Sequence, residues 1–208
     1  MASPSPLLYD TYYHIYNRGN NRENIFIQER NYEHFLNLHF KYIEPIAETY
    51  AYCLLRNHFH MLVRVKSEEE IFSNKEQTIR VLETLKVSDY PSKKFSDFFN
   101  AYAKAINNAY GRTGSLFQHP FGRVPITSDR QFWNVIAYIH QNPQKHKFVE
   151  DFRDWKYSSY GVLLSDKPTK IQRDIVLDWF GGKDGYLKLH EEWVTDVQSK
   201  WFAEDDGD

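Results

Sequence analysis

Residues 47–65, AETYAYCLLRNHFHMLVRV, set the architecture of the whole chain. Two runs within this stretch, 47–55 and 58–65, are rich in β-branched and aromatic residues, which is typical of strands. Only Arg56 and Asn57 separate them, and a two-residue connection is the commonest turn of an antiparallel hairpin. The stretch therefore predicts a β-hairpin.

Helices and further strands are expected on both sides of this hairpin. The predicted elements, in chain order, are a strand at 11–18, a helix from Glu29 to Pro45, the hairpin, a helix at 95–111, an extended segment at 115–126 and a helix at 129–141 that Pro143 should stop. Without the last helix, this order is the split βαβ pattern. We therefore expect an α+β fold, with a ferredoxin-like antiparallel sheet flanked by helices.

Two segments lie outside this pattern. Residues 67–94 begin with SEEE and are polar, so we interpret them as an insertion within a first domain that covers 1–160. Residues 161–208 are then an acidic, helical C-terminal extension, with helices expected near 171–180 and 184–201.

Composition excludes several classes of protein. A single cysteine, Cys53, excludes an internal disulfide framework and a cysteine-based zinc cage. No apolar run approaches the ~18 residues that a membrane helix needs, and the start lacks the regions of a signal peptide. We therefore expect a cytoplasmic protein with no membrane partner.

Charge is unevenly distributed along the chain. The net charge of −2 lacks the basic excess typical of nucleic-acid-binding proteins. However, an excess of four positive charges lies between 104 and 156, and the acidic end beyond it offsets this excess. Variation of this size is also ordinary for a protein surface.

The strongest local chemical signal is the pair His58 and His60. Residues two apart on a strand point to the same side of a sheet, and imidazole is a common metal ligand. Two structural histidines would give the same pattern, so both interpretations stay open.

A second signal lies in the predicted helix at 129–141. Tyr138 and Asn142 are four residues apart and share a helical face with Gln131 and Asn134. A tyrosine on a polar stripe is available for chemistry, although an ordinary half-buried tyrosine also fits.

Two further segments have the residue types of a nucleic-acid contact. The loop from Asn17 contains Arg18 and Arg22, which suit phosphates and base edges. The segment leading to Arg123 interleaves aromatic rings such as Phe117 with basic groups, as in single-strand binding. A polar turn and a core strand are the structural alternatives.

Taken together, five motifs resemble the HUH single-tyrosine transposases, in particular the REP-associated tyrosine transposase branch. In chain order they are YHIYNRG (13–19), NHFHMLV (57–63), GSLFQ (114–118), YIHQNP (138–143) and WKYSSY (155–160). Each motif alone is common, but five in the family's order are specific. The resemblance covers residues 12–160, which makes 1–160 an HUH transposase domain, and it does not account for the insertion.

The resemblance implies a site and a reaction. His58, His60 and Asn142 correspond to metal ligands, for Mg²⁺ or Mn²⁺, and Tyr138 corresponds to the nucleophile. The family cuts and rejoins single-stranded DNA near hairpins through a 5′-phosphotyrosine intermediate. The residues that we expect to contact DNA are Arg18, Arg22, Phe117 and Arg123.

The resemblance also implies the partners. They are single-stranded or hairpin DNA, and binding to DNA would bring the protein to the nucleoid. We expect no nucleotide cofactor, because no GxxxxGK[ST] motif occurs. We expect a monomer in preference to a homodimer.

Two alternatives remain. One is a non-catalytic, domesticated relative that holds DNA or RNA without cutting it. The other is a histidine-triad nucleotide hydrolase, which would need a further histidine where this chain has Leu62.

Overall fold

The computed structural model describes residues 5–73 and 86–195 of the chain. The strands are β1 (Tyr12–Arg18), β2 (Ala47–Leu54), β3 (His58–Val65) and β4 (Gly122–Ile126). The helices are α1 (Glu29–Ile43), α2 (Glu68–Ile71), α4 (Tyr90–Tyr110), α5 (Asp129–Lys145), α6 (Tyr160–Leu164), α7 (Arg173–Trp179) and α8 (Lys183–Thr195). Residues 74–85 of the expected insertion, and the end of the expected helix at 184–201, lie outside the described residues.

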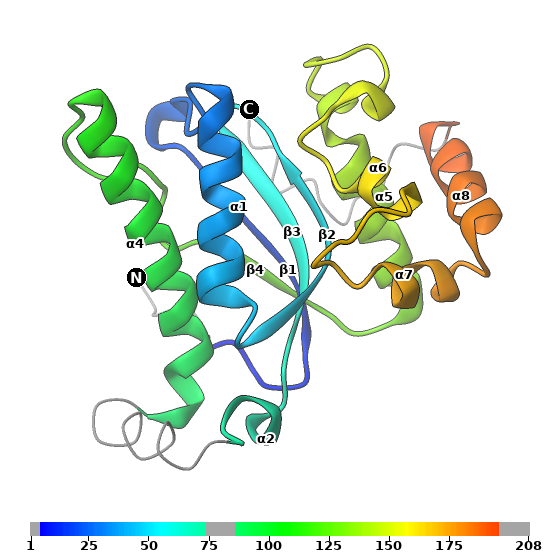
Figure 1. Cartoon of the computed structure of the whole chain (residues 1–208), viewed down its shortest axis with the longest axis horizontal. Coiled ribbons are helices and arrows are strands. Elements are labelled where there is room, and N and C mark those ends of the chain that lie inside the picture. The colour runs from blue at the N-terminus through cyan, green and yellow to red at the C-terminus, as the bar shows by residue number, and fades with distance from the viewer. Residues whose placement is uncertain (1–4, 74–85, 196–208) are drawn as a thin grey trace.

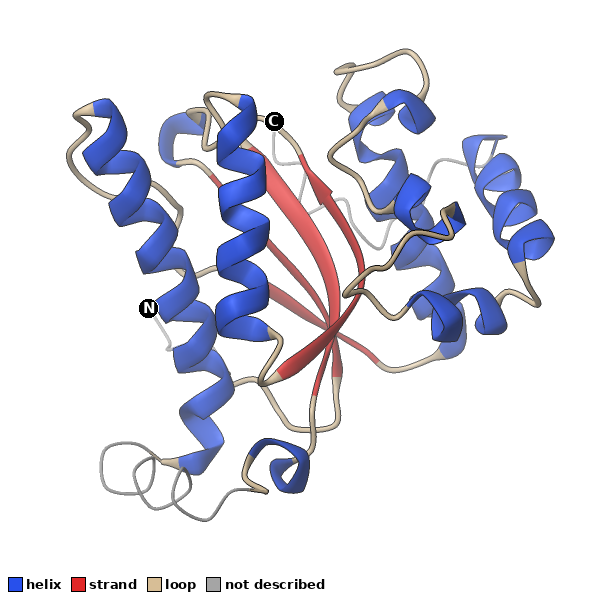
Figure 2. Cartoon of the chain, in the orientation of Figure 1, coloured by secondary structure: helices blue, strands red, loops and turns tan. Residues whose placement is uncertain are grey.

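The strands form one antiparallel sheet in the order β2-β3-β1-β4. Helices α1 and α4 pack together on one face, while α5 packs against β2 and β3 with the C-terminal helices outside it (Figures 1 and 2). This order confirms the expected α+β, ferredoxin-like arrangement. None of the helices in the described ranges is long and apolar enough to span a membrane.

The hairpin and the flanking strands follow the expected alternation. Phe59 and Met61 of β3 are fully buried, and Phe59 packs against Phe35 of α1 at a ring-centroid distance of 4.9 Å. Leu62 points to the other face and is also fully buried. Both faces of the central strands are therefore covered, as the mixed apolar pattern predicts.

Helix α5 does not end before Pro143, so that prediction is wrong. Proline lacks one N–H, but so near the helix end this removes a single backbone bond. The helical bonding resumes when His146 N donates to the Asn142 carbonyl at 3.0 Å. The helix therefore reaches Lys145.

Other boundaries shift as well. Helix α4 begins at Tyr90, because Pro91 suits the first turn of a helix, whereas the apolar periodicity begins only at Phe95. Strand β4 occupies only the last five residues of the expected extended segment, and Phe117 makes an isolated bridge to Gly19.

The C-terminal helices pack on α5. The Trp179 ring of α7 lies 4.5 Å from the Phe132 ring. His190 of α8 places its Nε2 2.8 Å from the Nδ1 of His140. The His190 Nδ1–H donates to the Tyr186 carbonyl at 2.7 Å, so His190 accepts through Nε2 and His140 donates. How the chain divides into domains stays a prediction.

Gly19 shows why a glycine is required beside the hairpin turn. Its N–H donates to the Asn57 carbonyl at 2.8 Å, and a Cβ on Gly19 would lie 2.1 Å from the backbone oxygen of Glu23. Backbone cannot move aside as a side-chain tip can. We therefore expect Gly19→Ala to lower the free energy of unfolding in urea by about 1–3 kcal/mol.

Gly161→Ala is the matched control, because a Cβ there has no neighbour within 4 Å. This variant should unfold within about 1 kcal/mol of the wild type. Equal stability of both variants would show that the loop adapts to the extra methyl group.

Candidate active site

The strand register gathers polar rings on the face that α5 covers. In the antiparallel pairing of β1 with β3, Tyr16 lies opposite His60, and Arg18 lies opposite His58. Paired residues share a face, and so do residues two apart. His14, Tyr16 and Arg18 therefore lie on the same face as both histidines, which confirms that His58 and His60 share one side of the sheet.

Tyr138 meets this face from α5. Its ring centroid lies 5.4 Å from that of His60 and 5.7 Å from that of His14, with both histidine rings near perpendicular to it. The side chain is only 3% exposed. The Lys145 ammonium lies 5.0 Å from the centroid of the same ring.

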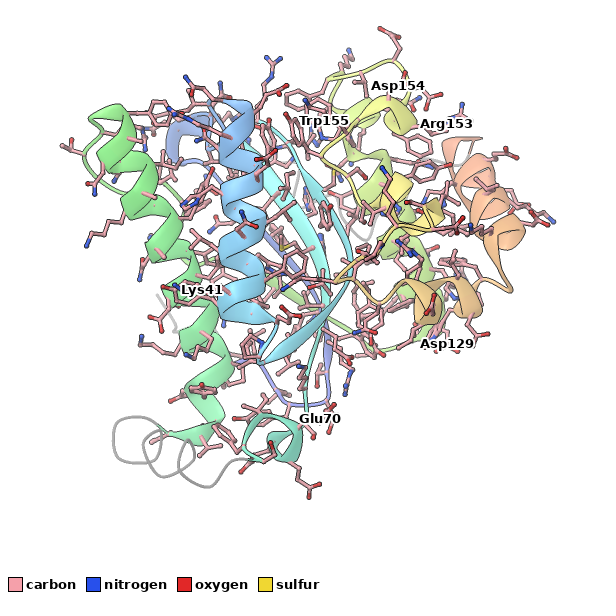
Figure 3. The ribbon with its side chains drawn as sticks, viewed as in Figure 1. Lys41, Glu70, Asp129, Arg153, Asp154 and Trp155 are labelled. Carbon is pink, nitrogen blue, oxygen red and sulfur yellow. The ribbon has the colours of Figure 1, made fainter. Side chains whose placement is uncertain are left out.

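Tyr138 is buried more deeply than the rest of the polar stripe to which the sequence assigns it. Gln131 and Asn134 of that stripe are half-buried, but every residue of α5 from 135 to 143 is buried. This half of the helix is enclosed because the sheet covers one side and the C-terminal helices cover the other. Figure 3 labels Asp129 at the start of α5 and Asp154 and Trp155 beyond its far end, where this enclosed half lies.

His60 is held as a neutral imidazole. Its Nδ1 lies 3.0 Å from the Nε2 of His14, and its Nε2 finds no hydrogen-bond partner among the described residues. Burial, followed by the nearby His14 and His58, lowers the pKa of His60 well below 6.5. A neutral imidazole with one unused ring nitrogen is the form that binds a metal.

Asn142 presents a second unused atom. It is fully buried, and its Nδ2 donates to the Tyr138 carbonyl at 3.1 Å. Its Oδ1 has no partner within residues 5–73 and 86–195. Amide oxygens suit Mg²⁺ and Mn²⁺, so this atom and the His60 Nε2 fit the two kinds of donor that the sequence predicted.

His58 is also oriented by a neighbour. Its Nδ1 lies 2.7 Å from the Asn57 side-chain oxygen, which can only accept, so Nδ1 carries a proton. In the part of the chain that the structure describes, no three His, Cys, Asp or Glu side chains form a group that could hold a metal. A bound ion would therefore depend on the Asn142 amide and on oxygens from the substrate or water.

Two further basic residues, which were not predicted to belong to the site, lie at the C-terminal end of α5. The His146 ring lies 4.8 Å from that of His58, and Lys145 covers Tyr138. The sequence does contain a signal for His146, because this residue continues the four-residue spacing of Tyr138 and Asn142. The expected stop at Pro143 had placed both of them outside the helix.

The four residues expected to contact DNA are placed differently from one another. Arg18 lies beside His58 on the site face, and its buried Nε has no partner in the described ranges. Arg22 is exposed in the short turn that follows β1. DNA contact by these two residues stays a prediction.

Phe117 and Arg123 are not brought to the site. The Phe117 ring is 2% exposed and packs 5.5 Å from Phe99, so it belongs to the core and has no free face for a base. Arg123 lies opposite Ile15, on the α4 side of the sheet, where its guanidinium stacks 3.8 Å above Phe121. Its Nη1 donates to the Ser5 carbonyl at 3.1 Å. The place of Arg123 follows from the register of β4, and that of Phe117 follows from its bridge to Gly19. The sequence specifies neither pairing.

Comparisons with known proteins indicate the family of the chain. No family model matches the chain. A protein of Haemophilus influenzae named as a REP-associated tyrosine transposase is 30% identical over 141 residues, which cover 68% of this chain and 71% of that protein. The solved structure of a REP-associated tyrosine transposase bound to a REP hairpin matches the fold with a TM-score of 0.56 at 16% identity, over 82% of this chain and 89% of that chain. The chain therefore belongs to the REP-associated tyrosine transposase family.

Proposed function

We propose that this protein is a metal-dependent endonuclease and strand transferase that acts on single-stranded DNA beside hairpins. The observation that carries the proposal is the contact of the Tyr138 ring with the His60 ring, whose Nε2 has no partner among the described residues. Family membership supports a transposase, and the relative solved with a REP hairpin supports hairpin DNA as the substrate.

The proposed step is attack by the Tyr138 hydroxyl oxygen on the scissile phosphorus. The new P–O bond forms a 5′-phosphotyrosine, the bond from phosphorus to the 3′-oxygen breaks, and the released strand end takes up a proton as a 3′-hydroxyl. In the reverse step, a 3′-hydroxyl attacks the phosphotyrosine and restores Tyr138. Because the covalent link conserves the phosphodiester bond, no nucleotide cofactor is needed.

Protein side chains prepare the tyrosine for this attack. The Lys145 ammonium near the ring favours the negatively charged phenolate that forms as the proton leaves. Lys145 is exposed, so it can also draw a backbone phosphate toward Tyr138. Arg18, beside His58 on the same face, is the second candidate for a phosphate contact.

His58, His60 and Asn142 would hold the metal ion. Mg²⁺ or Mn²⁺ bound there would polarise the phosphate and stabilise the charge that develops on it. The three side chains and Tyr138 come from one chain, which supports a monomeric enzyme.

The direct test is a covalent adduct between the wild-type protein and DNA. The protein is incubated with a labelled DNA hairpin that has a single-stranded flank, together with Mn²⁺ or Mg²⁺, and the adduct is detected on a denaturing gel. We expect an adduct in both metals, none in EDTA and none with a fully paired duplex. Mass spectrometry should place the nucleotide on Tyr138.

Two results would contradict the proposal. Hairpin binding with no adduct in either metal would identify a non-catalytic relative. Hydrolysis of a nucleoside phosphoramidate, with no effect on DNA, would identify a histidine-triad hydrolase.

A further inference from the structure

His14 of β1 lies in the middle of the site, although no motif assigns it a role. Its side chain is fully buried. Its ring stacks on that of His60 at 5.1 Å and 21°, and meets the Tyr138 ring edge-on at 5.7 Å. His14 is therefore in contact with both a proposed metal ligand and the proposed nucleophile.

The hydrogen bond between the two histidines holds a single proton. The His14 Nε2 and the His60 Nδ1 are 3.0 Å apart, so one of these nitrogens donates and the other accepts. Both rings are buried, which favours the neutral form of each imidazole. A neutral imidazole has one N–H, and two arrangements of the protons are therefore possible.

Metal binding by His60 would select between these arrangements, because each of them leaves one N–H on a buried outer nitrogen, the His14 Nδ1 or the His60 Nε2. If His14 donated, the His60 proton would lie on Nε2. If His60 donates through Nδ1, its Nε2 keeps the lone pair. Only the second arrangement leaves His60 able to bind a cation, and metal-binding histidines usually donate their other N–H to a fixed acceptor.

We propose that His14 is a positioning residue that accepts the Nδ1 proton of His60 and thereby keeps the His60 Nε2 lone pair directed into the site. The inference rests on the proposed function for the identity of the ligand, a divalent cation. Its claim about the proton on His60 can be measured in the metal-free protein.

Two substitutions separate acceptance of the proton from simple packing. His14→Phe keeps a ring of similar size but removes the acceptor, whereas His14→Gln offers an amide oxygen at a similar reach. We expect His14→Phe to weaken Mn²⁺ binding, measured by electron paramagnetic resonance, about 10–100-fold. His14→Gln should recover most of this loss.

His39 provides the matched control. It is a fully buried histidine on the α1 side of the sheet, and its Nε2 lies 2.8 Å from the Thr49 hydroxyl. His39→Phe also removes a buried hydrogen bond, but it does not touch the site. We expect this variant to bind Mn²⁺ as the wild type does.

The second measurement uses ¹⁵N NMR to locate the proton on His60 without metal. We expect it on Nδ1 in the wild type and in His14→Gln, and on Nε2 or shared between the nitrogens in His14→Phe. A wild-type proton on Nε2, or unchanged Mn²⁺ affinity and tautomer in folded His14→Phe, would overturn the role of His14. If the wild type binds no Mn²⁺, the proposed function fails, and the tautomer alone still tests His14.

Discussion

Tyr138→Phe is expected to abolish the covalent adduct with hairpin DNA and to slow strand cleavage at least about a thousandfold, which corresponds to roughly 4 kcal/mol of activation free energy. The substitution removes only the hydroxyl oxygen that would bond to phosphorus. The ring contacts with His60 and His14 persist, so the fold and hairpin binding should change little. Adduct yield, cleavage rate and the Kd for the hairpin are the three measurements.

Tyr16→Phe is the control for this prediction. Tyr16 lies on the same face, with its ring centroid 6.0 Å from that of His60, so it is the neighbouring hydroxyl that could substitute. We expect this variant to retain the adduct. An adduct of normal yield in Tyr138→Phe, or its loss only in Tyr16→Phe, would assign the nucleophile to another residue.

Acidification from pH 7 to pH 5 is expected to lower the free energy of unfolding by about 4 kcal/mol through two buried histidines that are not proposed metal ligands. Burial lowers the pKa of His39 to about 3 and that of His190 to about 4, from 6.5. The lower pKa means that the folded state resists protonation, whereas the unfolded chain takes up protons freely. Stability is therefore complete above about pH 6.5 and falls as the pH approaches 4.

The magnitude follows from the same values. A pH of 5 lies about 1.5 units below the pKa of 6.5 that a histidine has in the unfolded chain. Each unit lowers the free energy of unfolding by about 1.36 kcal/mol, so each histidine accounts for a loss of about 2 kcal/mol. Urea unfolding at pH 7, 6 and 5 measures the loss. His39→Leu should remove about half of the pH dependence attributed to this pair, and a stability that is constant from pH 7 to 5 would contradict the prediction.

The hairpin and the shared face of His58 and His60 could be predicted because both depend on local rules. Two-residue turns fix the register of neighbouring strands, and alternation fixes the side of the sheet. The pairing of β1 with β3 has no such turn, since α1 and β2 lie between them in the chain. The contact of His14 with His60 therefore appeared only in the structure.

The environment of Phe117, Arg123 and Tyr138 depends on packing that sequence periodicity does not encode. Arg123 is placed by where β4 joins the edge of the sheet, and Phe117 is placed by its bridge to Gly19. Tyr138 belongs to a polar stripe of α5, but it is buried because it faces the sheet, where its ring meets those of His60 and His14. The spacing within α5 therefore identified Tyr138 as a candidate, but segments distant in the chain determine how deeply Tyr138 is buried.

The hydrogen bond between His140 and His190 has a consequence for the order of synthesis. Helix α5 carries the proposed nucleophile, and His190 lies 50 residues further along the chain. On the ribosome, the sheet and α5 emerge well before α8, so the helix is first supported on one side only. Its second support forms when His190 has left the exit tunnel. A chain still being made can therefore place Tyr138 against His60 before His190 supports the opposite side of the helix.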